Sequence, residues 1–199
     1  VLKYRLPTSE SIIDPKWAPL QDAQRAIRLV RFYAKKWAIN PNQVGILGFS
    51  AGGHLASTLG THYDKDTLDE SNDPINELSA RPDFMALIYP VITFDKKHYH
   101  GGSKNNLIGP NASADLVDEF SNDLNVNPNT PPSFLVHSAD DKAVPIANSL
   151  LFYNALIKNG VSAEMHLYPK GGHGYALARG KGSLEDWPQL LFNWIHELN

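Results

Sequence analysis

The sequence has 199 residues, of which 42% are hydrophobic and 20% are charged, and its formal net charge at pH 7 is −3. A chain of this length can bury one sizeable core, so we expect a single domain over residues 1–199. The negative charge and the lack of Lys or Arg runs exclude nucleic acid and anionic membrane surfaces as expected partners, and no apolar stretch approaches the length of a membrane span. The absence of cysteine excludes disulfides and thiolate sites.

The first quarter of the chain passes from extended to helical patterns. Residues 1–6 are predicted as a strand that ends at a proline, and residues 9–19, with two further prolines, as a loop in which those prolines block a regular element. Apolar residues then recur every three or four positions over 20–37, which predicts an amphipathic helix with one buried face. The apolar run 44–49 is predicted as the next strand, and a helix of small residues follows it.

The middle of the chain has one strongly apolar segment between two polar stretches. Residues 64–83 are polar, whereas residues 84–89 are apolar without alternation, as in a parallel strand that is covered on both faces. Residues 94–132 have no strong period apart from a helix over 112–120, which Ser113 is expected to cap. A segment this long between core elements predicts a lid or a binding region.

The last third of the chain alternates strands and helices again. We expect a strand over 134–137, a helix over 145–159, a strand over 163–168 and a closing helix over 186–198. This alternation indicates an α/β fold, with a mostly parallel sheet, right-handed crossovers and helices on both faces. In such sheets, reactive groups collect in the loops beyond the carboxyl ends of the strands.

The segment Gly48-Phe49-Ser50-Ala51-Gly52 has the Gly-x-Ser-x-Gly spacing and lies between a predicted strand and a predicted helix, which is the context of a nucleophile elbow. A serine on such a turn has a strained backbone, and we expect a Cβ at either flanking glycine to crowd the crossing of strand and helix. The helix that begins at Ala51 has free N–H groups beside the serine oxygen, so Ala51 is the expected oxyanion donor. The alternative is a glycine-rich turn with a serine cap, because so short a pattern often occurs by chance.

A serine nucleophile needs a base, and histidine suits this role because its unperturbed pKa is about 6.5. Of the eight histidines, only His173 lies in a glycine-rich loop directly after the last predicted strand, in the sequence Gly-Gly-His-Gly. We therefore predict that His173 is the base, and the alternative is a solvent-exposed loop histidine. His54 is interpreted as a packing or capping residue, and His137 as a residue that orders the following loop. His98 and His100 have no nearby carboxylates, so no metal site is predicted.

The base must be held in one tautomer by a carboxylate. The loop after the strand at 134–137 offers two neighbours, Asp140 and Asp141, and the residues alone do not choose between them. One would be the acid of the triad and the other a turn residue. In either case the chain order Ser, Asp, His matches the α/β-hydrolase arrangement.

Several segments are distinctive together: GFSAGGHLAS, NLIG, TPPSFLVHSADDKAVP and YPKGGHGY. They resemble the acetylxylan esterase-related α/β hydrolases, small carbohydrate esterases near the hormone-sensitive-lipase and prolyl-oligopeptidase groups, and the resemblance covers nearly the whole chain from Tyr4 onward. It implies that Ser50 is the nucleophile and His173 the base. The acid of the family lies four residues after the His of a His-x-x-x-Asp-x-x-Val-Pro stretch, which favours Asp141. The implied substrates are acetyl or short acyl esters of sugars, such as xylan or its oligomers.

This interpretation gives a serine carboxylesterase that acts through an acyl-enzyme on a small-molecule or oligosaccharide ester and needs no cofactor. Phe94, Tyr99 and Tyr175 are candidates for lining the acyl or sugar pocket, although each could equally be an ordinary core residue. A homo-oligomer and the cellular location are left open. Two other functions also stay open: a peptidase of the prolyl-oligopeptidase type, and a catalytically impaired hydrolase-like protein that only binds.

The chain departs from the family at its start. Relatives carry a His-Gly-Gly segment upstream of the first predicted strand, whose backbone N–H groups supply half of the oxyanion hole, and this sequence has none there. The letters recur at His100-Gly101-Gly102, but after the nucleophile, so we interpret them as coincidence. We therefore expect a truncated chain that lacks the N-terminal strands of the fold, or a chain completed by another subunit.

Overall fold

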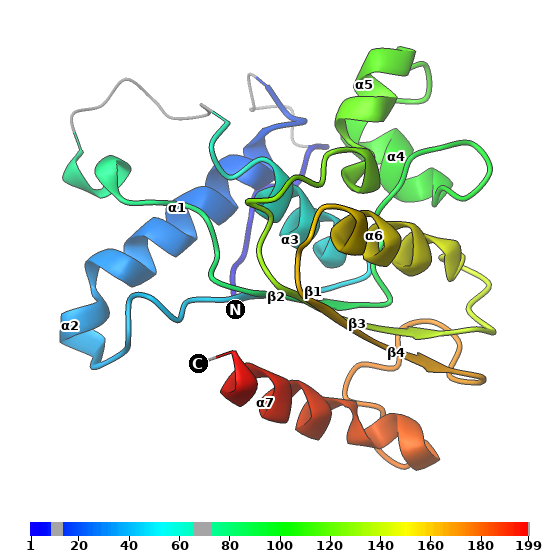
Figure 1. Cartoon of the computed structure of the whole chain (residues 1–199). Helices are drawn as coiled ribbons and strands as arrows, with labels where there is room; N and C mark the ends of the chain where they lie inside the picture. Colours follow the sequence, from blue (N-terminus) through cyan, green and yellow to red (C-terminus); the bar gives the residue numbers. More distant parts are fainter. Residues whose placement is uncertain (9–13, 66–72, 199) are drawn as a thin grey trace.

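The computed structural model describes residues 1–8, 14–65 and 73–198. Within these residues the chain forms a parallel sheet of four strands that lie side by side in chain order (Figure 1). The strands are β1 (Ile46–Phe49), β2 (Met85–Ile88), β3 (Ser133–Ser138) and β4 (Ala163–Tyr168). Because all of them run in the same direction, their carboxyl ends lie at one edge, where the loops that follow them meet.

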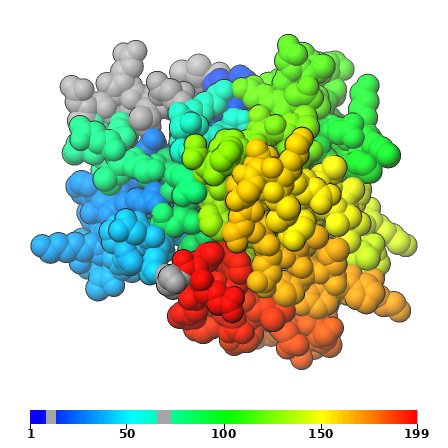
Figure 2. All heavy atoms as spheres, in the orientation of Figure 1, coloured from blue at the N-terminus to red at the C-terminus, as the bar shows by residue number. Residues whose placement is uncertain are grey.

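Helices cover both faces of the sheet. α3 (Ala51–Thr61) and α6 (Ala147–Lys158) pack on one face, and α7 (Trp187–Glu197) covers the other (Figure 1). α1 (Ala18–Phe32) packs against α3. In Figure 2 the red residues of α7 lie directly against the orange residues that follow β4. The other helical segments are α2 (Ala34–Trp37), α4 (Gly101–Ile108), α5 (Ala114–Glu119), η1 (Pro74–Glu77), η2 (Asn122–Leu124) and η3 (Gly182–Asp186).

Strand β2 is buried on both faces, which explains its unbroken apolar sequence. Met85 and Leu87 belong to the core cluster formed with α3 and α6, whereas Ala86 and Ile88 belong to the cluster formed with α7. All four side chains are 0–1% exposed. Full burial of a side chain as large as Leu or Ile contributes roughly 2 kcal/mol. Because its side chains belong to both clusters, this strand joins the two apolar layers of the molecule. The predicted strand with two covered faces is confirmed.

Most of the other predicted elements are present within two residues of the expected bounds. The helix expected over 20–37 forms as α1 and α2, separated at Tyr33, whose φ of −92° and ψ of 7° leave helical geometry. It also starts earlier than expected, at Ala18. Pro19 lies in the first turn, where a missing N–H has no helical partner to lose, so the expectation that this proline blocks a helix is wrong.

Residues 1–6 are not a strand, which corrects the first predicted element. The segment is held by α1: the backbone N–H of Arg5 donates to the carboxylate of Asp22 at 2.6 Å, and its guanidinium donates to the same carboxylate at 2.8 Å. Tyr4 packs against the core cluster that α1 and α3 share. A strand needs a neighbouring strand to pair its backbone, and here the Arg5 N–H bonds a helix side chain instead.

The region over 94–132 contains one predicted and one unexpected helix. In α5 the side chain of Ser113 accepts the Leu116 N–H at 3.3 Å, as predicted. α4 was not predicted, because its sequence is polar and starts with two glycines; the His100 side chain caps it by accepting the Ser103 N–H at 3.1 Å. The role of residues 94–132 as a lid or a binding region stays a prediction.

The loop predicted over 9–19 and the polar stretch over 64–83 are described only in part, since residues 9–13 and 66–72 lie outside the described residues. Among the helices of the described ranges, none is both long enough and apolar enough to span a membrane.

Candidate active site

Ser50 lies on the turn between β1 and α3. Its backbone has φ 52° and ψ −119°, a conformation that costs a residue with a side chain on the order of 1–3 kcal/mol. The neighbouring strand and its loop hold this turn: the Ser50 N–H donates to the Ile88 carbonyl at 3.1 Å, and the Ser50 carbonyl accepts from the Val91 N–H at 3.0 Å. Strand, strained turn and helix thus occur in the order that a nucleophile elbow requires.

The two glycines that flank Ser50 in the motif are not equivalent. A Cβ at Gly48 would overlap the carbonyl of Gly52, because α3 crosses β1 at this point. A Cβ at Gly52 would meet no atom of the described residues within 4 Å, so the expectation that it would crowd the crossing is wrong. The second close approach falls one residue later: a Cβ at Gly53 would lie 2.6 Å from the Cβ of Pro90.

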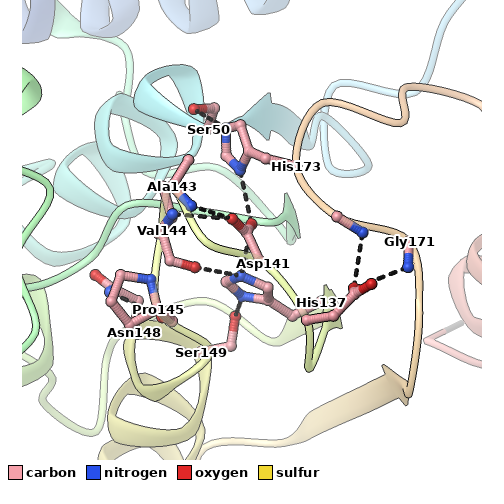
Figure 3. A network of polar contacts seen from close by, with 12 residues as sticks. Ser50, His137, Asp141, Ala143, Val144, Pro145, Asn148, Ser149, Gly171 and His173 are labelled. Carbon is pink, nitrogen blue, oxygen red and sulfur yellow. Dashed lines mark hydrogen bonds and ion pairs between the residues drawn. The ribbon is translucent and has the colours of Figure 1, made fainter.

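His173 lies in the loop after β4 and meets the side chain of Ser50 (Figure 3). Its Nε2 is 2.8 Å from the Ser50 Oγ. Gly172 and Gly174, on either side of it, have φ values of 64° and 73°, which glycine adopts without steric cost. The imidazole is 25% exposed, so a substrate can reach it.

Asp141 lies behind His173, in the loop after β3. Its Oδ2 accepts from Nδ1 of His173 at 2.7 Å, and its Oδ1 accepts the backbone N–H groups of Ala143 and Val144, both at 2.9 Å. Burial raises the pKa of Asp141, but the hydrogen bonds from His173 and the two backbone N–H groups outweigh burial and lower this pKa below its usual value. Asp141 is therefore ionised at neutral pH. The carboxylate keeps a proton on Nδ1 of His173, which leaves Nε2 able to accept from Ser50.

The neighbouring Asp140 contacts the backbone of the same loop. Its Oδ1 accepts the N–H of Gly171 at 2.9 Å and that of Gly172 at 2.8 Å. Of the two aspartates between which the residues did not decide, Asp141 contacts the imidazole and Asp140 holds the loop that carries it.

Tyr89, the residue after β2, supports the His173 loop from another side. Its ring stands edge-on to the imidazole, with 4.9 Å between centroids, and its hydroxyl accepts the Ala176 N–H at 3.1 Å. Trp187 holds the same residue by donating from Nε1 to the Ala176 carbonyl at 3.0 Å. Sequence reasoning missed Tyr89, although its position directly after the central strand could have indicated it.

A cavity of about 150 Å³ opens beside Ala51. Ala51 is the first residue of α3, so its N–H has no acceptor within the helix. The lining of the cavity is mainly apolar and comes from α1, α3, α4 and the segments near them; it includes Leu20, Ala51, Leu55, Phe94, Leu107 and Phe120. Ala51, the residue that follows Ser50, thus has a backbone N–H without a helical acceptor and borders an apolar cavity.

The three predicted pocket residues have different positions. Phe94 lines the cavity and stacks on His54, with 4.5 Å between centroids. Tyr99 is 39% exposed in the loop before α4 and is not part of the cavity lining. Tyr175 is 6% exposed and packs against Tyr89 in the cluster with α7, so in this structure it is a core residue.

His54 and His100 have structural contacts. Nε2 of His54 donates to the Phe120 carbonyl at 2.9 Å, and burial lowers the pKa of His54 to about 4, so the ring is neutral at neutral pH. The segment that begins at His100 forms the start of α4. In the ranges that the structure covers, no three His, Asp or Glu residues are grouped so that they could hold a metal ion.

A parallel sheet covered by helices, a serine on a strained elbow, and a histidine and an aspartate aligned behind it define an α/β hydrolase. The chain belongs to the BD-FAE family, whose model matches residues 2–156. The predicted fold class and the resemblance to acetylxylan esterase-related α/β hydrolases are confirmed by this match and by the relatives that follow.

The names of two similar proteins refer to xylan. The chain is 34% identical over 202 residues to the acetylxylan esterase of Xylanibacter ruminicola, an alignment that covers 100% of this chain and 38% of the relative. It is 37% identical over 178 residues to endo-1,4-beta-xylanase B of Butyrivibrio fibrisolvens, covering 89% of this chain and 27% of the relative. The chain therefore spans well under half the length of these two proteins.

The structure is also similar to that of an acetyl ester-xyloside bifunctional hydrolase from Caldicellulosiruptor lactoaceticus. The TM-score is 0.88 and the sequence identity 45%, over 98% of this chain and 70% of the other. The carboxylesterase Cest-2923 of Lactobacillus plantarum has a TM-score of 0.77 and 25% identity, over 98% of this chain and 72% of the other.

Proposed function

We propose that this protein is a serine carboxylesterase that removes acetyl or other short acyl groups from a carbohydrate such as xylan or its oligosaccharides. The observation that carries the proposal is the alignment of three side chains: Ser50 Oγ lies 2.8 Å from Nε2 of His173, and Nδ1 of His173 lies 2.7 Å from Asp141. The names of the relatives support the choice of substrate, since two of them refer to acetyl esters and all three refer to xylan or xylosides.

In the first half of the reaction, the Ser50 oxygen attacks the ester carbonyl carbon. Nε2 of His173 takes the Ser50 proton as the bond forms, and the ionised Asp141 stabilises the resulting imidazolium. The carbonyl oxygen becomes an oxyanion, which the N–H of Ala51 at the N-terminus of α3 stabilises. His173 then protonates the sugar oxygen, which leaves as a hydroxyl group, and an acyl-enzyme remains on Ser50.

In the second half, water replaces the sugar. His173 takes a proton from the water as its oxygen attacks the acyl carbon, and the Ala51 N–H again faces the oxyanion. The bond to Ser50 breaks, His173 returns the proton to Ser50, and acetate leaves. Every proton in these steps passes through His173.

The cavity beside Ala51 supports a short acyl group. An apolar cavity of about 150 Å³ is large enough for a benzene-sized group, so an acetyl group fits with room to spare. The sugar hydroxyl must leave into water, and the imidazole of His173 that protonates it is 25% exposed to solvent.

The experiment compares the purified protein with its Ser50→Ala variant on three substrates: p-nitrophenyl acetate, acetylated xylo-oligosaccharides and a proline-containing peptide amide. We expect turnover of both esters, loss of turnover in the variant by on the order of a millionfold in kcat, and no cleavage of the amide.

Other outcomes would select the other functions that the sequence leaves open. Cleavage of the amide alone would indicate a peptidase. No turnover of any substrate, with the folded protein still binding xylo-oligosaccharides, would indicate a protein that only binds.

A further inference from the structure

His137 is a second imidazole in contact with Asp141, on the side opposite His173 (Figure 3). It lies in β3 and its side chain is completely buried. Its Nε2 is 3.2 Å from the Asp141 Oδ2, the same oxygen that accepts from His173. An imidazole from a strand and an imidazole from a loop therefore meet at one carboxylate oxygen.

The neighbours of His137 fix its tautomer. Nε2 is also 3.1 Å from the carbonyl oxygen of Val144, and both of its partners there are acceptors only, so Nε2 must carry a proton. Nδ1 lies 2.8 Å from the hydroxyl of Ser149 in the first turn of α6. Burial lowers the pKa of His137, so the ring is neutral and Nδ1 accepts the Ser149 proton.

With this tautomer, both carboxylate oxygens of Asp141 accept two hydrogen bonds. Oδ1 is held by the backbone N–H groups of Ala143 and Val144, and Oδ2 by the two imidazoles. The backbone bonds fix one end of the carboxylate, but the plane of the group, and hence the direction in which Oδ2 points, depends on the donors to Oδ2. His173 lies in a glycine-rich loop and its side chain is 25% exposed, whereas His137 is enclosed in the core.

We propose that His137 is a positioning residue for the esterase reaction: through the chain of hydrogen bonds from Ser149 to His137 to Asp141 it holds the carboxylate aimed at His173. This inference rests on the proposed function. His137 does not contact Ser50 or the reacting atoms; it acts through Asp141, and it ties the start of α6 to the site. The hydroxyl groups of Tyr89 and Tyr175 also feel the charge of Asp141, which contributes to the raised pKa of each.

The test compares His137→Leu, which removes the donor, with His137→Gln, whose side-chain amide can place an N–H near the position of Nε2. His166→Leu is the matched control, since this histidine lies on the neighbouring strand and contacts Glu164 instead. We expect His137→Leu to lower kcat for p-nitrophenyl acetate by about tenfold to a hundredfold with KM unchanged within about twofold, because misplacement of the carboxylate affects the chemical step and not substrate binding. His137→Gln should recover most of the loss, and His166→Leu should keep wild-type kcat.

A second measurement does not depend on turnover. The Nδ1 proton of His173, bound to a carboxylate at 2.7 Å, should give a far-downfield NMR signal that exchanges slowly with water. This signal should weaken or move in His137→Leu and in Ser149→Ala, and stay in His137→Gln and His166→Leu. Should His137→Leu fail to fold, Ser149→Ala and His137→Gln give the same comparison.

An unchanged kcat and an unchanged proton signal in folded His137→Leu would overturn the proposal. Equal losses in the Leu and Gln variants with an unchanged signal would also overturn it, because that result assigns only a packing role. Failure of the wild-type protein to turn over esters would reject the proposed function, while the proton signal still reports on the contact of His137 with Asp141.

Discussion

Asp140 and Asp141 are neighbours in sequence but contact different parts of the loop that carries His173. The Asp141 carboxylate accepts from the imidazole at 2.7 Å, and the Asp140 carboxylate accepts from the backbone N–H groups of Gly171 and Gly172, the two residues directly before His173. One side chain therefore controls the tautomer of His173, and the other controls the course of the loop.

This difference predicts unequal effects of the same isosteric substitution. Asp141→Asn should lower kcat for ester hydrolysis by on the order of ten-thousandfold, because the amide no longer favours the proton on Nδ1 of His173. Asp140→Asn keeps an oxygen that can accept from the two glycine N–H groups, so its kcat should stay within about tenfold of wild type. Steady-state kinetics of the two purified variants make the comparison, and a larger loss in Asp140→Asn would reverse the assignment.

Alanine substitutions at the two glycines of the elbow should have unequal effects on stability. In Gly48→Ala the new Cβ would overlap the Gly52 carbonyl, a backbone atom that cannot rotate away, so we expect a loss of about 3 kcal/mol or more in the free energy of unfolding. Gly52→Ala adds a methyl group in open space on a helix and should change stability by less than about 1 kcal/mol, or raise it. Urea denaturation monitored by tryptophan fluorescence measures both, and similar losses would contradict the model of the crossing.

Strain at Ser50 predicts that Ser50→Gly is more stable than Ser50→Ala, because only glycine relieves the strained backbone. Ser50 and an alanine at this position both keep a Cβ at φ 52°, whereas glycine does not. We expect the free energy of unfolding of Ser50→Gly, measured by urea denaturation, to exceed that of Ser50→Ala by about 1 kcal/mol. This holds even though glycine increases the entropy of the unfolded chain. If Ser50→Ala is the more stable of the two, the turn is not strained.

The buried His54 predicts a loss of stability in mild acid. Its pKa is about 4 in the folded protein, below the usual 6.5, because burial disfavours the charged ring. Between these two pH values the unfolded chain binds more protons than the folded one, so the free energy of unfolding falls as the pH falls from 6.5 to 4. The full effect of this one group is about 3 kcal/mol at most.

His54→Gln is the matched variant for this prediction, since an amide can still donate to the Phe120 carbonyl but does not titrate. Urea denaturation at pH 7, 5.5 and 4 should show that the wild-type protein loses more stability on acidification than the variant does. Parallel losses in the two proteins would mean that other groups cause the acid sensitivity.

The elements that the sequence predicts well are those with local causes. The apolar run of β2, the three- and four-residue period of α1 and the Ser113 cap of α5 each depend on residues within a few positions of one another. The same holds for the elbow motif and for the glycine loop around His173, which is why Ser50 and His173 can be chosen from the sequence.

The features that the sequence does not predict depend on residues far apart in the chain. Residues 1–6 have a strand-like pattern, but only the folded molecule reveals that Asp22, and not a strand, is the partner of Arg5. The role of Tyr89 depends on a contact with Ala176, 87 positions later. The two aspartates have the same chemistry and adjacent positions, so the direction of each side chain, which the fold sets, is what separates them.

The most direct test of the central claim is covalent labelling by a fluorophosphonate, which reacts with a serine that an adjacent base activates. Intact-mass analysis followed by peptide mapping should find one adduct per chain, on Ser50, and the rate of labelling should fall sharply in Asp141→Asn. No adduct on the folded protein, or an adduct on another residue with Ser50 unmodified, would contradict the account.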